Sequence, residues 1–234
     1  MTMVLVIEED RSASEWLVRT LETGGHAVES TRNVETGLDR LRSLPRTDLV
    51  LVDLALPRTI GFQFLRDLRE ERNDVPVIAL SAQADEADRV QTFRLGADHL
   101  VVQPISATEL LARVDCLIER SRARRTPPNG VPSFSSAYCF GDVEVNAATR
   151  QVRRGGVPVQ LAPLELELLL ALIRREGAAA ARVELLKEVW GYESDVVSRT
   201  LDTHVANLRN KLERDPAVPR HILTVRKTGY RLQT

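Results

Sequence analysis

The sequence predicts two domains: an α/β domain with a five-stranded, doubly wound parallel sheet, followed by a smaller α+β domain. Short apolar runs alternate with amphipathic stretches over the first 120 of the 234 residues. The stretch 121–137 then combines a basic cluster with prolines, serines and an Asn-Gly pair, which is linker composition. We therefore expect a first domain over 1–121, a linker over 122–137 and a second domain over 138–234.

The first domain alternates buried strands with amphipathic helices. Its short Val-, Leu- and Ile-rich runs are typical of strands that are covered on both faces. Such βα alternation implies a parallel sheet with helices on both sides. The expected strands are 3–7, 26–28, 48–52, 75–80 and 99–102, and the expected helices include 11–24, 34–44, 62–71 and 107–120.

The formal net charge of −1 conceals an asymmetry. Residues 1–120 hold 14 basic and 21 acidic side chains, a net of −7, whereas 199–234 hold 8 and 3, a net of +5. Concentrated positive charge indicates a phosphate-bearing partner such as nucleic acid. No apolar run approaches the roughly 20 residues of a membrane helix, so we expect a cytoplasmic protein with no membrane partner. Cys116 and Cys139 form no metal-binding pair.

Acidic residues stand at the ends of two expected strands. Glu8 and Glu9 follow the first strand, and Asp53 ends the third. Ligands of parallel sheets bind at the carboxyl ends of the strands. Three converging carboxylates would repel one another unless a cation neutralised them, and oxygen ligands suit Mg²⁺. The alternative is that these carboxylates only cap helix N-termini.

Motifs in this half resemble the receiver domain of bacterial two-component response regulators, which has a flavodoxin/CheY-like fold. The matching motifs are Glu8-Glu9, Asp53-Leu54-Ala55-Leu56-Pro57, Gly61, Ser81-Ala82, Gly96-Ala97-Asp98 and Gln103-Pro104. The resemblance implies that Asp53 accepts a phosphoryl group from a histidine kinase. It implies Mg²⁺ ligands at Glu8, Glu9, Asp53 and the Ala55 carbonyl, and switch positions at Ser81, Leu100 and Gln103.

Four positions depart from that pattern. Gln103 replaces the usual lysine, so a charge-assisted bond to the phosphoryl group is lost. Glu9 replaces an aspartate, Leu100 an aromatic residue, and Ile60 a common aspartate. We hypothesise an atypical receiver in which Asp53 is phosphorylated weakly or not at all and Mg²⁺ occupancy is low. The alternative is a conventional, phosphorylation-activated regulator that uses Asp53 and Mg²⁺ despite Gln103.

The resemblance also implies a homodimer through the receiver. Its charged interface positions are Arg89, Asp98, Glu109 and Arg113, and His99 stands where an acidic residue is usual. Ordinary surface charges are the alternative, because an exposed ion pair contributes only about 0–1 kcal/mol.

The sequence of the second domain predicts short strands over 138–160, three helices and a terminal hairpin. The helices are expected at 164–175, 182–190 and 198–213, and the hairpin strands at 222–226 and 229–233. Three helices followed by a β-hairpin describe a winged helix.

The third helix of this domain has an apolar and a polar face. Leu201, Val205, Leu208 and Leu212 form the core stripe. An α-helix fits the major groove, where Asn reads adenine and Arg or Lys reads guanine. The expected DNA contacts are Arg199, Thr203, His204, Asn207, Arg209, Asn210 and Lys211 on the helix, and Arg226, Lys227 and Arg231 on the hairpin. The alternative is a helix that only solubilises the domain; the basic hairpin beside it argues against this.

This half resembles the effector domain of OmpR/PhoB-type response regulators. The matching motifs are Leu161-Ala-Pro-Leu-Glu165, Val189-Trp-Gly-Tyr192, Ser198-Arg-Thr-Leu-Asp202, Thr224-Val-Arg226 and Gly229-Tyr230-Arg231, among others. The resemblance implies a helix in the major groove, Arg226 in the minor groove, and contact with RNA polymerase through Trp190, Tyr192, Glu193 and Asp195.

These features favour a DNA-binding transcriptional regulator that is not an enzyme. An aspartate-nucleophile phosphatase would need a second aspartate two residues after Asp53, where this chain has Ala55. A receiver that acts only as a protein-interaction adaptor is the other alternative, and Arg226 on the hairpin argues against it.

Overall fold

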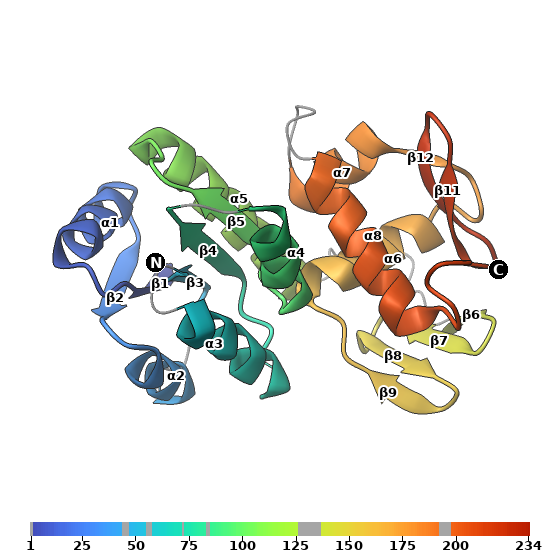
Figure 1. Cartoon of the computed structure of the whole chain (residues 1–234), viewed down its shortest axis with the longest axis horizontal. Helices are drawn as coiled ribbons and strands as arrows, with labels where there is room; N and C mark the ends of the chain where they lie inside the picture. The colour runs from blue at the N-terminus through green and yellow to red at the C-terminus, as the bar shows by residue number, and fades with distance from the viewer. Residues whose placement is uncertain are drawn as a thin grey trace. The chain divides into compact units, whose positions relative to one another are not determined.

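A computed structural model describes residues 2–43, 47–54, 58–71, 73–82, 85–125, 137–191 and 198–234. The side chains of 58–59, 123–125, 137 and 198–199 are not described. The chain divides into two compact units, residues 1–128 and 129–234, and each is described by itself (Figure 1).

The N-terminal unit contains a five-stranded parallel sheet with the order β2-β1-β3-β4-β5. Its strands are β1 (Met3–Ile7), β2 (Ala27–Thr31), β3 (Leu49–Asp53), β4 (Val77–Ser81) and β5 (His99–Val102). The inner strands β3 and β4 lie at the centre of the domain's core, because every residue of both is buried. The predicted doubly wound sheet is thereby confirmed.

Five helices cover the two faces of this sheet (Figure 1). They are α1 (Arg11–Thr23), α2 (Val34–Ser43), α3 (Arg58–Glu70), α4 (Glu86–Arg94) and α5 (Ala107–Arg125). Alternate residues of β1 point to opposite faces: Leu5 and Ile7 join the cluster with α2 and α3, and Val4 and Val6 join the one with α1 and α5.

Two elements extend well beyond their predicted ends, and one helix was not predicted. β2 continues to Thr31 rather than ending at residue 28, because it is an edge strand whose partly exposed positions tolerate Glu29 and Ser30. Helix α4 has too few apolar residues for its period to predict it. Helix α5 continues to Arg125, beyond the expected boundary at 121.

The C-terminal unit is the expected winged helix. A four-stranded antiparallel sheet comes first, in the order β6-β7-β8-β9. Three helices and a second sheet, ordered β10-β12-β11, follow it. The elements are β6 (Ala137–Phe140), β7 (Val143–Asn146), β8 (Gln151–Arg154), β9 (Val157–Val159), α6 (Pro163–Ile173), β10 (Ala180–Ala181), α7 (Arg182–Trp190), α8 (Ser198–Leu212), β11 (Ile222–Val225) and β12 (Gly229–Leu232).

The two-residue strand β10 ties the hairpin to the helices. It pairs with β12, with Ala181 opposite Gly229. A Cβ atom on Gly229 would lie 2.2 Å from the Ala180 carbonyl oxygen, so only glycine permits this close approach. The hairpin of β11 and β12, hereafter the wing, is therefore fixed to the domain at its base. Within the described ranges, no helix has both the length and the apolar character that a bilayer crossing requires.

Candidate functional site

Buried polar side chains meet at the carboxyl edge of the N-terminal sheet. Glu8 follows β1, Asp53 ends β3 and Ser81 ends β4, and these three strands are neighbours. All three side chains are buried, with exposed fractions of 3%, 7% and 8%. Parallel strands bring their carboxyl ends to one edge, which explains why residues so distant in sequence meet.

Glu8 and Asp53 form a coupled carboxyl pair. Burial raises the pKa of Glu8 from 4.5 to about 7. The N–H of Asp10, which donates to Glu8 Oε1 at 3.0 Å, lowers this pKa, and the charge of Asp53 and its hydrogen bond to Glu8 raise it. Near neutral pH the pair therefore holds a proton for part of the time.

This pair has the chemistry of a small magnesium site. Mg²⁺ is commonly bound through one or two carboxylates, and it would replace the shared proton with a stronger positive charge. Glu8 and Asp53 fit that description. The structure does not bring Glu9 to them: Glu9 is exposed, and no group of three or more His, Cys, Asp or Glu side chains within the described ranges could hold a metal. Ala55 lies outside the described residues.

The expected switch positions flank the carboxyl pair. The backbone N–H of Gln103 donates to the Ser81 carbonyl at 2.9 Å, which places both residues at the same edge of the sheet. Gln103 precedes a cis peptide bond to Pro104. Leu100 is half-buried and packs against the core that includes α2 and α3. The site thus combines a buried carboxylate with a buried hydroxyl, and the backbone of Gln103 is bonded to the residue that carries the hydroxyl.

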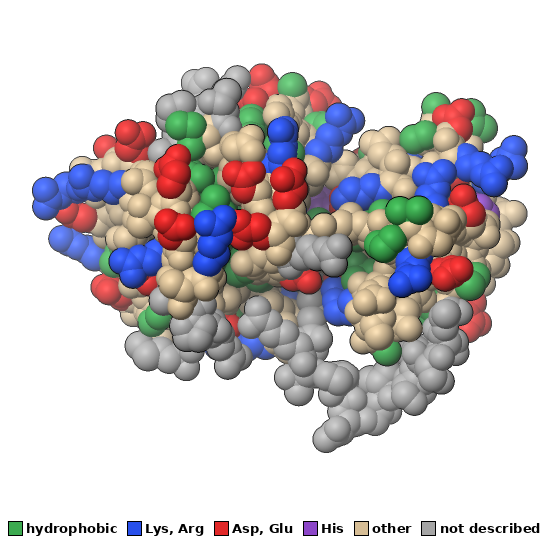
Figure 2. All heavy atoms as spheres, turned by 90° about the horizontal axis from the view of Figure 1, so that it is seen from below, with side chains coloured by type: hydrophobic (Ala, Val, Ile, Leu, Met, Phe, Trp, Pro, Cys, Tyr) green, Lys and Arg blue, Asp and Glu red, His purple; other side chains and the backbone are tan. Residues whose placement is uncertain are grey.

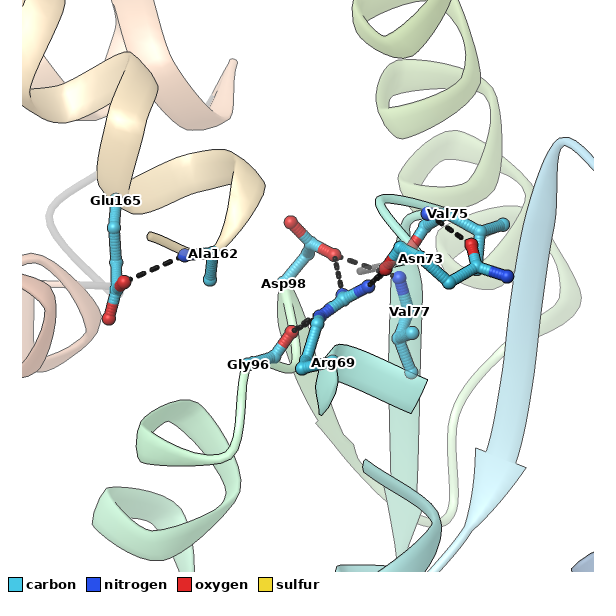
Figure 3. A network of polar contacts seen from close by, with 8 residues as sticks. All are labelled: Arg69, Asn73, Val75, Val77, Gly96, Asp98, Ala162 and Glu165. Carbon is cyan, nitrogen blue, oxygen red and sulfur yellow. Dashed lines mark hydrogen bonds and ion pairs between the residues drawn. The ribbon is translucent and has the colours of Figure 1, made fainter. Parts of the chain in front are cut away.

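One of the four expected dimer residues belongs to the interior instead. Asp98 is 1% exposed, and its Oδ2 accepts from the Val77 N–H at 2.8 Å and from Arg69 Nη2 at 3.3 Å (Figure 3). Arg69 also donates to the carbonyls of Gly96, Asn73 and Val75. The expectation of Asp98 at an interface is therefore corrected, because its carboxylate is used to join α3 to the start of β4.

The remaining dimer candidates stay at the surface. Arg89 on α4 is exposed. On α5, Arg113 Nη2 lies 2.7 Å from Glu109 Oε1, with side-chain exposures of 24% and 52%. These two charges neutralise each other within one helix.

The recognition surface of the C-terminal unit is narrower than the sequence indicates. On α8, Asn210 is exposed and Thr203 is half-buried. The side chain of Arg199 is not described. Of the other expected contacts, His204 and Asn207 are buried, and Arg209 and Lys211 bond to other parts of the protein.

His204 and Trp190 pack against each other in the core. Their rings lie 5.0 Å apart edge-to-face, with 1% and 0% of the residues exposed. His204 Nδ1 lies 2.8 Å from the Thr200 carbonyl oxygen. His204 was expected to contact DNA and Trp190 to contact RNA polymerase. Both expectations are corrected, because both side chains belong to the core. The other expected polymerase contacts, Tyr192, Glu193 and Asp195, lie outside the described residues.

The cations near the end of α8 also serve the fold. Arg209 donates to the Ile222 carbonyl and to Thr224 Oγ1, both at 2.9 Å, so it fastens α8 to the wing. Lys211 Nζ lies 2.5 Å from Glu165 Oε2, and Glu165 is fully buried. Asn207 is 3% exposed. Arg209 and Lys211 thus contact other parts of the domain and Asn207 is buried, which a helical wheel does not show because it omits the neighbouring elements. Their role as DNA contacts stays a prediction.

Glu165 shows why Lys211 is held in place. In Figure 3 its carboxylate turns back toward the start of α6, where Oε2 accepts from the Ala162 N–H at 2.8 Å. This is the acceptor half of a capping box. A fully buried carboxylate requires a positive partner, and Lys211 provides it.

The wing presents the expected cations to solvent. Arg226, Lys227 and Arg231 are exposed, and Lys227 adopts a left-handed backbone with φ of 64° at the turn. Figure 2, which views the molecule from below, shows lysine and arginine side chains on the C-terminal unit together with some acidic ones. The wing is the basic surface that the charge asymmetry predicts.

Sequence reasoning missed a cluster that joins the wing to α8. The Tyr230 hydroxyl donates to Asp202 Oδ1 at 2.5 Å, and Arg182 forms an ion pair with the same carboxylate. Arg209 lies 5.9 Å from the centre of the Tyr230 ring. Burial raises the pKa of Tyr230 to about 12, and its bond to Asp202 adds to this effect, so the phenol keeps its proton. The Gly229-Tyr230 motif was the available signal.

Both halves of the chain match known families. Residues 4–115 match the family described as "Response regulator receiver domain", and residues 156–232 match "Transcriptional regulatory protein, C terminal". The chain is 37% identical to the KDP operon transcriptional regulatory protein KdpE of Escherichia coli, over 99% of each protein. It is also 37% identical to the DNA-binding response regulator MtrA of Mycolicibacterium smegmatis, over 97% of this chain and 95% of MtrA.

Solved structures give the same result. The response regulator DrrB of Thermotoga maritima, described as an OmpR/PhoB homolog, is 28% identical with a TM-score of 0.50, over all of both chains. A mutant of RitR has a TM-score of 0.76 at 22% identity, covering 100% of this chain and 99% of that one, which shows the fold alone.

The fold and its two sites define a response regulator with a receiver domain and a winged-helix effector domain. The chain belongs to the OmpR/PhoB family, and it is a DNA-binding transcriptional regulator.

Proposed function

We propose that this regulator binds promoter DNA as a dimer and that its receiver is phosphorylated on Asp53 weakly or not at all. The proposal of weak phosphorylation rests on the presence of glutamine at position 103. Its backbone N–H donates to the Ser81 carbonyl, so a residue with a neutral side chain follows β5 at the position where the resemblance implies a lysine. A histidine kinase is the proposed phosphodonor.

The chemistry of phosphorylation explains why a glutamine at position 103 should weaken phosphorylation of Asp53. An oxygen of Asp53 would attack the phosphorus of a phosphohistidine, the P–N bond would break, and the imidazole would leave with a proton. Mg²⁺, when bound by Glu8 and Asp53, neutralises charge on the phosphoryl oxygens. The new group carries close to two negative charges. An ammonium would stabilise them with a positive charge as well as a hydrogen bond, whereas the amide of Gln103 can donate a hydrogen bond but adds no charge.

Mass spectrometry after incubation with acetyl phosphate and Mg²⁺ tests this proposal. We expect the wild type to show little of the gain of about 80 Da that one phosphoryl group adds. Gln103→Lys should gain more, and Asp53→Ala, the matched control, should gain none. A stoichiometric gain in the wild type, together with tighter dimerisation, would contradict the proposal.

That outcome would favour the second candidate, a conventional regulator activated by phosphorylation. One observation supports it: Glu8, Asp53 and Ser81 are all buried at one edge of the sheet, as phosphotransfer requires. The Gln103→Lys variant separates the two candidates, because a conventional receiver gains little from an added ammonium.

We propose DNA binding through the outer face of α8 and through the wing. Arg226 would enter a minor groove, and Lys227 and Arg231 would contact phosphates. In a gel shift at stated salt, Arg226→Ala should weaken binding by about 1–3 kcal/mol. Arg153→Ala, which removes an equally exposed arginine from β8, is the matched control and should change affinity little.

Two protein contacts complete the proposal. The receiver would dimerise through the α4, β5 and α5 face, where Arg89, Glu109 and Arg113 are candidates. RNA polymerase would contact Tyr192, Glu193 and Asp195. Sedimentation of Arg89→Glu against wild type tests the first contact, since a dimer that uses Arg89 should dissociate. In vitro transcription with Glu193→Ala tests the second, because DNA binding should persist while activation falls.

A further inference from the structure

Apart from Arg199, whose side chain is not described, the outward face of α8 carries small and neutral side chains. Its core stripe of Leu201, Val205, Leu208 and Leu212 is at most 1% exposed. Opposite this stripe, Ala206 and Asn210 are exposed and Thr203 is half-buried. The three lie at i, i+3 and i+7, so they form one line along the helix. This line, hereafter the reading stripe, presents two methyl groups and one amide.

The longer cations that could read guanine are held elsewhere. Arg209 donates both to the Ile222 carbonyl and to Thr224 Oγ1, and Lys211 pairs with the buried carboxylate of Glu165. Withdrawing Lys211 would leave that carboxylate buried and uncompensated, which is strongly unfavourable. Among the α8 side chains that the structure describes, the cations therefore stabilise the domain.

Different side chains recognise different base edges in the major groove. Guanine is read by Arg or Lys at O6 and N7, whereas adenine is read by a bidentate Asn or Gln. The thymine methyl group is recognised by apolar contact with groups such as an alanine or threonine methyl. The reading stripe therefore matches A·T pairs.

We propose that α8 selects a half-site whose core consists of A·T pairs, with Asn210 and Ala206 as its specificity-determining residues. This inference rests on the proposed DNA binding. Ala206 and Asn210 are separated by about 6 Å along the helix axis, at 1.5 Å per residue. Base pairs rise by about 3.4 Å, so the two side chains address pairs one or two steps apart. The whole stripe spans about 10 Å, or three pairs.

The wing suits the same class of site if Arg226 enters a minor groove as proposed. Arg226 is exposed on a wing whose base is held by the pairing of Gly229 with Ala181. Runs of A·T pairs narrow the minor groove and strengthen its negative potential, which attracts an inserted arginine. A site rich in A·T pairs would therefore suit both the helix and the wing.

Selection of bound duplexes from a random library by the full-length protein tests the inference. The expected result is an enriched half-site with two A·T pairs one or two steps apart. On that site, Asn210→Ala should lose about 5- to 150-fold of its discrimination against a G·C replacement at one pair. Ala206→Arg should shift one neighbouring position toward guanine. Ala206→Gln, of similar length but neutral, should retain A·T at that position.

The outcomes separate this inference from the proposed function. A wild-type protein that binds no duplex at low salt overturns the proposed DNA surface. One that binds tightly but enriches a guanine-containing core, or shows no sequence preference, overturns the reading stripe alone. Unchanged selection by both Asn210→Ala and Ala206→Arg, in variants that keep wild-type melting temperatures, likewise overturns it.

Discussion

The carboxylate of Glu213 joins the end of α8 to the start of the wing, and its neutralisation should destabilise the effector domain. Glu213 is 4% exposed. Its Oε1 accepts from the N–H groups of His221 and Ile222 at 2.8 and 2.7 Å, and its Oε2 accepts from Arg220 at 3.0 Å. Burial alone would raise the pKa of Glu213, but these three backbone bonds outweigh it and hold the pKa below 4.5.

The hydrogen bonds of Glu213 set the loss of stability expected for Glu213→Gln. One amide oxygen can retain the two bonds at Oε1 in weaker, neutral form. The amide nitrogen cannot accept from Arg220, so one charge-assisted bond is lost and two donors face each other. Bonds to charged groups contribute about 1.5–3 kcal/mol and neutral ones about 0.5–1.5, so one lost and two weakened bonds give a loss of about 3.5–6 kcal/mol. For a domain of this size the melting temperature should fall by at least about 8 °C.

Calorimetry of the full chain, with the fluorescence of the buried Trp190 identifying the effector transition, measures this loss. Glu144→Gln makes the same chemical change on exposed β7 and is the control. Because the folded pKa of Glu213 is lowered, its stabilisation is present above the unfolded pKa of about 4.5 and disappears as the pH falls through the folded value. The difference in melting temperature between wild type and Glu213→Gln should therefore narrow as the pH falls. A Glu213→Gln protein that melts within about 2 °C of the control refutes the reasoning.

Three further predictions follow from named contacts. Tyr230→Phe removes the hydroxyl that donates to Asp202 and should destabilise the effector domain by about 1–2 kcal/mol in urea unfolding; no change would show that the bond adds nothing. Arg69→Ala leaves the Asp98 carboxylate buried without its partner, so the receiver should lose about 3–5 kcal/mol, measured by thermal melting; a loss below about 1 kcal/mol would contradict this. The raised pKa of Glu8, about 7, means that its contribution is fully present below pH 4.5 and is lost as the pH rises through 7. Without metal, the receiver should therefore lose about 3 kcal/mol over that range, and Glu8→Gln should abolish this slope.

Local sequence signals predicted most of the fold. β3 and β4 are continuous apolar runs, which only a doubly covered strand accommodates, and the structure buries every residue of both. α7 begins and ends where predicted, at Arg182 and Trp190: Glu184 accepts from the Ala181 N–H at its start, and Gly191 takes the left-handed conformation at its end. α4 escaped prediction because its short, polar sequence has no clear period.

The candidate sites were predicted less completely than the elements that carry them. The acidic edge follows from topology, so Glu8 and Asp53 meet as expected. Asp98 illustrates the limit: its motif indicates a surface charge, but Arg69 reaches it from α3 and draws it into the interior (Figure 3). Sequence spacing does not reveal which distant side chain completes an ion pair.

The amino-acid sequence by itself determined the two-domain organisation, the strand and helix order, the acidic edge of the receiver and the basic character of the wing. Each of these depends on short-range periodicity, on chain order or on charge counted along the chain. Only the tertiary structure decided which side chains remain available for partners. Arg209, Lys211 and His204 lie on or beside the polar face of α8, yet Ile222, Glu165 and Trp190 engage them. Those partners come from three other segments, and long-range packing alone brings them to the helix.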